Sequence, residues 1–168
     1  MPNPNGFKMR RQTEALLCSQ FLAENYPTAR TYIQQYVGPI KPAAELAGLS
    51  KSEKLALGTG RRRADAIAIT PDRIVVIETY IHVHLGKLSQ LMTYLELVSS
   101  TPELADYKTL PTEGLLVGAQ RDPIMDQMAA KFGIEVIIFR PVWVVEYLKN
   151  VAARHSRDRT NVELPVRG

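Results

Sequence analysis

The chain has 168 residues, 45% hydrophobic and 23% charged, with 21 Lys and Arg against 17 Asp and Glu, for a formal net charge of +4. This length and composition are those of a globular protein that can bury a substantial core. No apolar run approaches the roughly 18 residues that span a bilayer, and the first residues lack the apolar region of a secretory signal. We therefore expect no membrane partner, and a cytoplasmic location, or a virion if the chain is phage-encoded.

The pattern of apolar residues predicts helices and strands that alternate along one domain. Residues 1–8 read as an N-terminal arm, 9–153 as the single domain and 154–168 as a basic tail. Predicted helices cover 9–26, 43–47, 50–57, 86–99, 122–132 and 142–153, and predicted strands cover 31–37, 63–70, 73–84, 114–119 and 134–139, the last as a buried strand. Strands interleaved with helices indicate an α/β fold, with a mixed central sheet flanked by helices.

The central feature is a hairpin whose turn is Thr70-Pro71-Asp72-Arg73. Proline at the second position of a turn presets the backbone for a type I turn. If Thr70 lies opposite Arg73, the same register places Asp65 opposite Glu78 and Arg63 opposite Tyr80 on one face of the sheet. A longer turn with a bulge would shift this register by one residue and separate the two carboxylates.

Two carboxylates this close repel each other unless a cation lies between them. One candidate cation is Mg²⁺, which prefers oxygen ligands. The other is the guanidinium of Arg63, which the hairpin register places on the same face. The residues alone leave both possibilities open. Cys18, the single cysteine, excludes an internal disulfide and is predicted to be a buried, unreactive thiol.

The element order and these carboxylates resemble the PD-(D/E)XK nuclease superfamily, whose restriction-endonuclease-like core runs α-β-β-β-α-β. Asp65 matches its first carboxylate and Glu78 its second. Gln90 and Tyr94 resemble the Q-x-x-x-Y feature of the RecB and lambda-exonuclease branch, and Glu14 lies where several members place a further metal-associated glutamate. The resemblance implies an Mg²⁺ site formed by Asp65, Glu78 and Glu14, with Gln90 and Tyr94 contacting nucleic acid.

One position departs from the family pattern. The motif lysine, two residues after Glu78, is replaced by Tyr80, which is neutral at pH 7 and supplies no positive charge. Lys87 is the candidate substitute, because it lies three residues before Gln90 and so on roughly the same face of the predicted helix. Alternatively, Lys87 is simply a solvated charge in the first turn of that helix.

The basic triplet Arg61, Arg62 and Arg63 flanks the candidate site and is predicted to contact phosphates of nucleic acid. The first functional hypothesis is a nuclease-fold protein with impaired catalysis that acts as a DNA-proximal binding or structural component, such as a tailed-phage head-completion or neck protein. Its partners would be double-stranded DNA or DNA ends and other subunits of the assembly, and the chain itself could form a homo-oligomer. The alternative is an active Mg²⁺-dependent nuclease that uses Asp65, Glu78 and Lys87. A third, weaker option is a scaffold without nucleic-acid contact.

Overall fold

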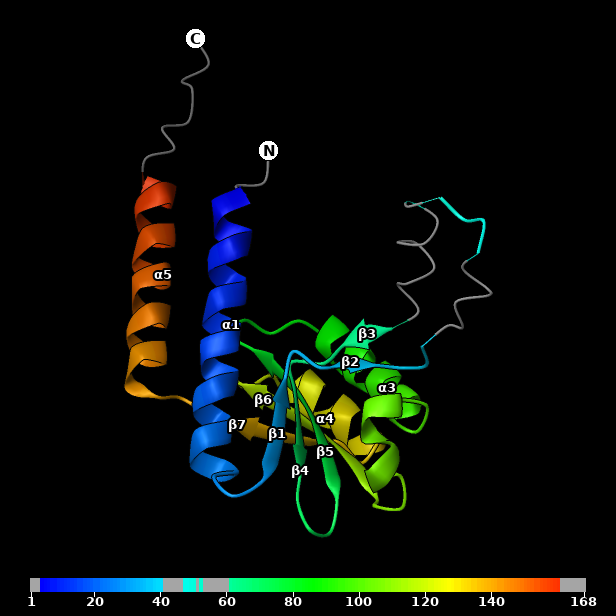
Figure 1. The fold of residues 1–168 in the computed structure, drawn as a ribbon. Helices are drawn as coiled ribbons and strands as arrows, with labels where there is room; N and C mark the ends of the chain where they lie inside the picture. The colour runs from blue at the N-terminus through cyan, green and yellow to red at the C-terminus, as the bar shows by residue number, and fades with distance from the viewer. Residues whose placement is uncertain (1–3, 41–46, 51, 53–60, 161–168) are drawn as a thin grey trace. The chain divides into compact units, whose positions relative to one another are not determined.

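The computed structural model describes residues 4–40, 47–50, 52 and 61–160, and the side chains of those from 12 to 153 (Figure 1). The chain divides into two compact units, one ending at Ile138 and the other beginning at Phe139, and each is described by itself. The predicted helical pieces at 43–47 and 50–57 fall largely outside the described residues. Among the helices that are described, none combines the length and the apolar character that a membrane crossing requires.

The first unit is a mixed sheet with helices, as predicted, and the described part of the second contains one helix. The elements of the first unit are α1 (Pro4–Asn25), β1 (Arg30–Ile33), β2 (Tyr36–Val37), β3 (Arg62–Arg63), β4 (Ala66–Ile69), β5 (Ile74–Tyr80), α3 (Gly86–Val98), the 3-10 helix η2 (Pro102–Tyr107), β6 (Thr112–Gly118), α4 (Pro123–Lys131) and β7 (Glu135–Ile138); the second unit contains α5 (Val142–Thr160). The main sheet has the strand order β1-β4-β5-β6-β7, and β2 and β3 form a separate two-stranded ribbon.

The hairpin β4–β5 has the predicted register. Ile69 pairs with Ile74 and Ala66 with Ile77, and the Thr70 N–H donates to the Arg73 carbonyl at 3.0 Å across the turn. Strands β5, β6 and β7 are parallel to one another, whereas β1 and β4 are antiparallel to their neighbours. The order helix, strand, hairpin, helix, strand expected from the sequence is therefore present.

The ladder ends one residue earlier than predicted. The chain bends at Asp65, whose carboxylate accepts a hydrogen bond from the Thr79 N–H at 2.9 Å, so Asp65 is not a ladder partner of Glu78. The predicted pairing of Arg63 with Tyr80 is wrong. Arg63 instead pairs with Tyr36 in the two-stranded ribbon, because this bend carries the chain out of the main sheet.

Several predicted boundaries are also corrected. The first helix begins at Pro4, within the predicted arm, because proline is compatible with the first turn of a helix. The predicted strand 31–37 is broken at Gln34, whose positive φ of 55° interrupts extended backbone. The last helix continues to Thr160, beyond the predicted start of the tail at 154. Strand β7 is at the sheet edge and only partly buried, because one of its sides has no neighbouring strand.

The two faces of β5 are covered by different helices. Ile74, Val76 and Tyr80 on one face belong to a core cluster that includes Leu91 of α3 and Met125 of α4. On the other face, the Thr79 hydroxyl donates to the Glu14 carbonyl of α1 at 3.3 Å. The end of β5 therefore lies between α1 and α3, the place where Glu14 and Lys87 approach each other.

Candidate functional site

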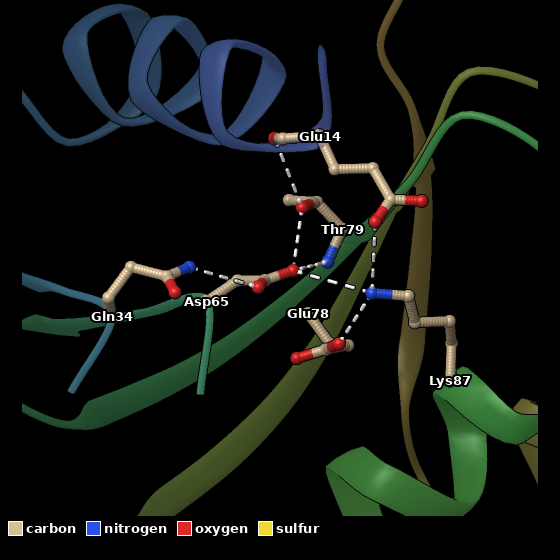
Figure 2. Close-up of polar contacts among 6 residues, drawn as sticks. All are labelled: Glu14, Gln34, Asp65, Glu78, Thr79 and Lys87. Carbon is tan, nitrogen blue, oxygen red and sulfur yellow. Dashed lines mark hydrogen bonds and ion pairs between the residues drawn. The ribbon is translucent and has the colours of Figure 1, made fainter. Parts of the chain in front are cut away.

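Lys87 holds three carboxylates together at the carboxyl end of β5 (Figure 2). Its Nζ lies 2.7 Å from Glu78 Oε1, 3.5 Å from Glu14 Oε2 and 3.7 Å from Asp65 Oδ2. All four side chains are largely buried, with exposed fractions of 13% for Lys87 and 3% for Glu78. The lysine predicted from its helical position thus reaches the carboxylates predicted from the hairpin.

Each member of this cluster comes from a different element. Glu14 projects from α1, Asp65 from the bend before β4, Glu78 from β5 and Lys87 from the first turn of α3. The first turn of α3 begins at Gly86, where a Cβ would lie 2.6 Å from the imidazole Cε1 of His84. The His84 side chain is exposed and can move aside, so this contact does not require glycine. The turn before Lys87 is closed by the Lys87 N–H, which donates to the His84 carbonyl at 2.9 Å.

Asp65 is held by groups that the sequence did not single out. Its Oδ2 accepts hydrogen bonds from the Thr79 hydroxyl at 2.7 Å and from the Thr79 N–H at 2.9 Å. Its Oδ1 accepts from the Gln34 side-chain amide at 3.3 Å, while the Gln34 N–H donates to the Asp65 carbonyl at 2.8 Å. Gln34 and Thr79 therefore fix the orientation of this carboxylate toward Lys87.

Burial and charge act against each other in this cluster. Burial, reinforced by the Asp65 carboxylate, raises the pKa of Glu78 to about 7, although the Lys87 ammonium opposes the change. Burial acts to lower the pKa of Lys87, but the carboxylates of Glu78, Asp65 and Glu14 outweigh it and raise that pKa above its ordinary value. Lys87 is consequently a permanent cation at neutral pH.

The cluster opens into a cavity of about 210 Å³. Its lining comprises Glu14, Ala15, Gln34, Arg63, Asp65, Glu78, Lys87, Gln90 and Tyr94. Arg63, Gln90 and Tyr94, three of the predicted nucleic-acid contacts, therefore lie beside the carboxylates. Three acidic and two basic side chains line this one cavity.

Arg61 and Tyr80 are held by contacts outside this cavity. Arg61 does not line this cavity: its Nη2 donates to Glu103 Oε2 at 2.7 Å and to the Tyr36 carbonyl at 2.9 Å. Tyr80 is fully buried in the core, where its ring lies so close over Gly118 that a Cβ at position 118 would collide with it. Tyr80 lies on the same face of β5 as Glu78, since alternate residues of a strand share a face, but its side chain is not among those that line the carboxylate cavity.

We tested whether the carboxylates suit Mg²⁺. Within the described residues, no group of three or more His, Cys, Asp or Glu side chains is arranged to hold a metal ion; the carboxylates surround the Lys87 ammonium instead. Glu78 Oε2, however, is buried with no hydrogen-bond partner in the described part of the chain. A buried carboxylate oxygen without a partner is costly, and hard oxygen donors are those that Mg²⁺ prefers. The oxygen donors are therefore of the type that Mg²⁺ prefers, whereas their arrangement in this structure surrounds the Lys87 ammonium.

Comparisons with known proteins give little beyond this geometry. No protein-family model matches the chain, and no curated protein matches it. Among solved structures it is similar to a repair endonuclease from Pyrococcus abyssi, with 17% identity and a TM-score of 0.48 over 75% of this chain and 46% of that one. It is also similar to a protein of unknown function, with 10% identity and a TM-score of 0.47 over 73% of this chain and 56% of that one.

The chain thus spans about half the length of these two solved structures. At such low identity and score, neither likeness carries an inference about the activity of this chain. This chain is a mixed α/β protein whose described residues form a five-stranded main sheet and a cluster of three carboxylates around Lys87.

Proposed function

We propose that this chain is a metal-dependent phosphodiesterase that cleaves nucleic acid. The observation that supports this proposal most directly is the 2.7 Å contact between Lys87 Nζ and Glu78 Oε1. Through this contact the Lys87 ammonium lies beside the carboxylates. A cation is therefore present there even though the position two residues after Glu78, where the resembled pattern has lysine, carries Tyr80. The cluster therefore contains both kinds of group that phosphodiester cleavage needs, oxygen ligands for a metal and a positive charge for the phosphate.

Glu78, Asp65 and Glu14 would hold the Mg²⁺ ion, which when bound supplies an activated water and polarises the phosphodiester. Lys87 stabilises negative charge that develops on the phosphate, because its ammonium is fixed before the substrate arrives. Thr79 keeps Asp65 oriented through the 2.7 Å hydrogen bond from its hydroxyl. Arg63 lines the same cavity and can draw a phosphate toward the carboxylates.

A second candidate function is a binding or structural protein without cleavage. The same Lys87 contacts favour it, because an ammonium between three carboxylates neutralises part of the charge that a metal would otherwise balance. In this form the chain would bind DNA or DNA ends beside other subunits, and a tailed-phage head-completion or neck protein is one such setting. That setting is an expectation from the sequence alone.

Cleavage of linear DNA separates the two candidates. The purified chain is incubated with single-stranded and double-stranded DNA in Mg²⁺, Mn²⁺ or EDTA, beside the variants Glu78→Gln and Glu113→Gln. Glu113 makes the matched control, because it is an exposed carboxylate at the start of β6, outside the cavity lining.

A phosphodiesterase gives metal-dependent cleavage that Glu78→Gln abolishes and Glu113→Gln retains. DNA binding without cleavage in any metal would overturn the first candidate and favour the second. Cleavage that survives in both variants would mean that the activity does not come from this cluster, and neither candidate would explain it.

A further inference from the structure

A second cavity lies next to the carboxylate cluster. Its volume is about 360 Å³, and it is lined by Arg62, Ser89, Gln90, Thr93 and Tyr94. We propose that it is a subsite for a backbone phosphate that flanks the scissile one, so that a nucleic-acid strand runs from one cavity into the other. This inference rests on the proposed function, since it assigns the neighbouring part of the same substrate.

The two cavities are contiguous. Gln90 and Tyr94 line both of them, one helical turn apart on α3. Arg62 lines the second cavity and Arg63 the first, because successive side chains of a strand point in opposite directions. The β-strand β3 therefore supplies one guanidinium to each cavity. Two guanidinium groups placed in this way can each bind one of two successive phosphates of a nucleic-acid backbone.

The second cavity differs from the first in charge. Three carboxylates line the first cavity, whereas Arg62 is the one charged side chain among the described residues that line the second. A cavity with a guanidinium and no acid favours an anion over a cation. Metal binding thus belongs to the first cavity, and phosphate binding without metal to the second.

The neutral groups of the second cavity supply donors. The Gln90 amide and the Ser89 hydroxyl can donate to phosphate oxygens. The Thr93 hydroxyl donates to the Ser89 carbonyl of the same helix at 2.9 Å, so its proton is already used and it does not serve as a donor to phosphate. Burial and the nearby Glu78 and Asp65 carboxylates raise the pKa of Tyr94 to about 12, so the Tyr94 hydroxyl keeps its proton at neutral pH.

Binding measured in EDTA tests this subsite apart from cleavage. A fluorescent single-stranded DNA of about 12 nucleotides is titrated with protein at several salt concentrations, and anisotropy gives the dissociation constant. Arg62→Gln is compared with Arg73→Gln, which removes the same charge from an exposed arginine at the hairpin turn, outside both cavities. We expect Arg62→Gln to weaken binding about 3- to 10-fold and to lower the salt slope by about 0.7, the contribution of one single-strand phosphate.

Arg73→Gln is expected to change the dissociation constant less than about twofold, since its charge is distant and screened. Ser89→Glu, which places a carboxylate in the cavity, should weaken binding at least as much as Arg62→Gln. If Arg62→Gln binds as Arg73→Gln does, or if the wild type shows no salt-dependent binding, the subsite is overturned. Loss of binding in Arg62→Gln together with no cleavage in any metal would retain the subsite and overturn only the phosphodiesterase.

Discussion

Lys87 Nζ lies 2.7 Å from Glu78 Oε1, although the two residues belong to different elements, a helix and a strand. The turn that joins β5 to α3 makes this contact possible: the Lys87 N–H donates to the His84 carbonyl at 2.9 Å, which places Lys87 near the end of β5. The result is a lysine in the place where a catalytic cation is useful, supplied from a position that the motif spacing does not use.

Lys87→Met is expected to lower the rate of DNA cleavage by about 10²- to 10³-fold, the cost of removing one preorganised charge from a phosphoryl site. It should also destabilise the protein by roughly 3–5 kcal/mol, because it leaves buried carboxylates facing one another without the ammonium. Cleavage rates and urea unfolding measure the two effects. Lys131→Met, a change at the end of α4 outside the cavity lining, is the control and should alter neither.

Tyr80→Lys introduces a lysine at the position of the PD-(D/E)XK pattern that the sequence resembles, but we expect its ammonium not to reach the carboxylate cavity. Tyr80 is fully buried over Gly118, so a lysine there would bury an unpaired charge, at a cost of more than about 4 kcal/mol. Tyr80→Phe is the matched control. Within the described residues the Tyr80 hydroxyl has no hydrogen-bond partner, so we expect Phe to be nearly neutral. Faster cleavage by Tyr80→Lys would show that position 80 does face the site.

Thr79→Val is expected to loosen Asp65, since it removes the hydroxyl that donates to Asp65 Oδ2 at 2.7 Å and keeps the shape of the side chain. We expect a stability loss of about 1–3 kcal/mol, the cost of a buried acceptor that loses a donor. Thr79→Ser, which keeps the hydroxyl, should recover most of the cleavage that Thr79→Val loses. Equal activity in the two variants would mean that the hydroxyl does not position Asp65.

The part of this site that the sequence predicts is the part fixed by local geometry. Pro71 and Asp72 define the turn, the turn defines the register, and the register brings Asp65 and Glu78 to one end of the sheet. Helical spacing likewise places Lys87 on the same face as Gln90. These inferences need only neighbours in sequence, which is why the sequence predicts side chains that the structure brings within contact of one another. Their proposed roles stay a prediction.

The remainder depends on tertiary contacts that no local pattern encodes. Gln34 adopts a positive φ because its N–H and its side chain both bond to Asp65, and this breaks the predicted strand. Arg61 was grouped with its two neighbours as a phosphate contact, but Glu103, distant in sequence, pairs with it. Thr79 occupies the variable position of the motif, so no spacing indicated its role.

The Cys18 thiol is expected to make stability depend on pH above 9. Burial, with the Asp65 and Glu78 carboxylates, raises its pKa from 9.0 to about 12. Between these values the unfolded chain loses the thiol proton while the folded chain retains it. The free energy of unfolding therefore falls as pH rises, by up to about 1.4 kcal/mol per pH unit from this group.

Urea unfolding of the wild type and of Cys18→Ala from pH 8 to 11 measures this contribution. In Cys18→Ala the free energy of unfolding should fall less steeply with pH than in the wild type, whatever the absolute stability of the variant. A disulfide reagent at pH 8 should react with the thiol only after unfolding, since Cys18 is 1% exposed. Rapid reaction of the folded protein would contradict this placement.

Glu103→Gln tests whether Arg61 positions the ribbon that carries Arg62 and Arg63. Arg61 Nη2 joins Glu103 Oε2 at 2.7 Å to the Tyr36 carbonyl at 2.9 Å, and so fastens the ribbon strand β2 to η2. Removing one acid raises the net positive charge, so general electrostatics predicts tighter DNA binding. If the Arg61–Glu103 ion pair holds the ribbon in place, the opposite is expected. Without the pair, Arg62 would be less ordered before binding, and the entropy lost on binding would weaken DNA binding by about 2- to 5-fold.

The opposite signs of these expectations make the measurement decisive. Glu113→Gln removes the same charge at an exposed position far from the ribbon in sequence, where it breaks the exposed ion pair with Arg73 at 3.3 Å and leaves the contacts of Arg61 in place. It therefore shows the effect of charge without a change at the ribbon, and should bind DNA slightly more tightly. If Glu103→Gln binds DNA as tightly as Glu113→Gln does, the ion pair of Arg61 plays no part in presenting Arg62 to the strand. If it binds more weakly than the wild type, Arg61 contributes to DNA binding by holding the ribbon that carries Arg62.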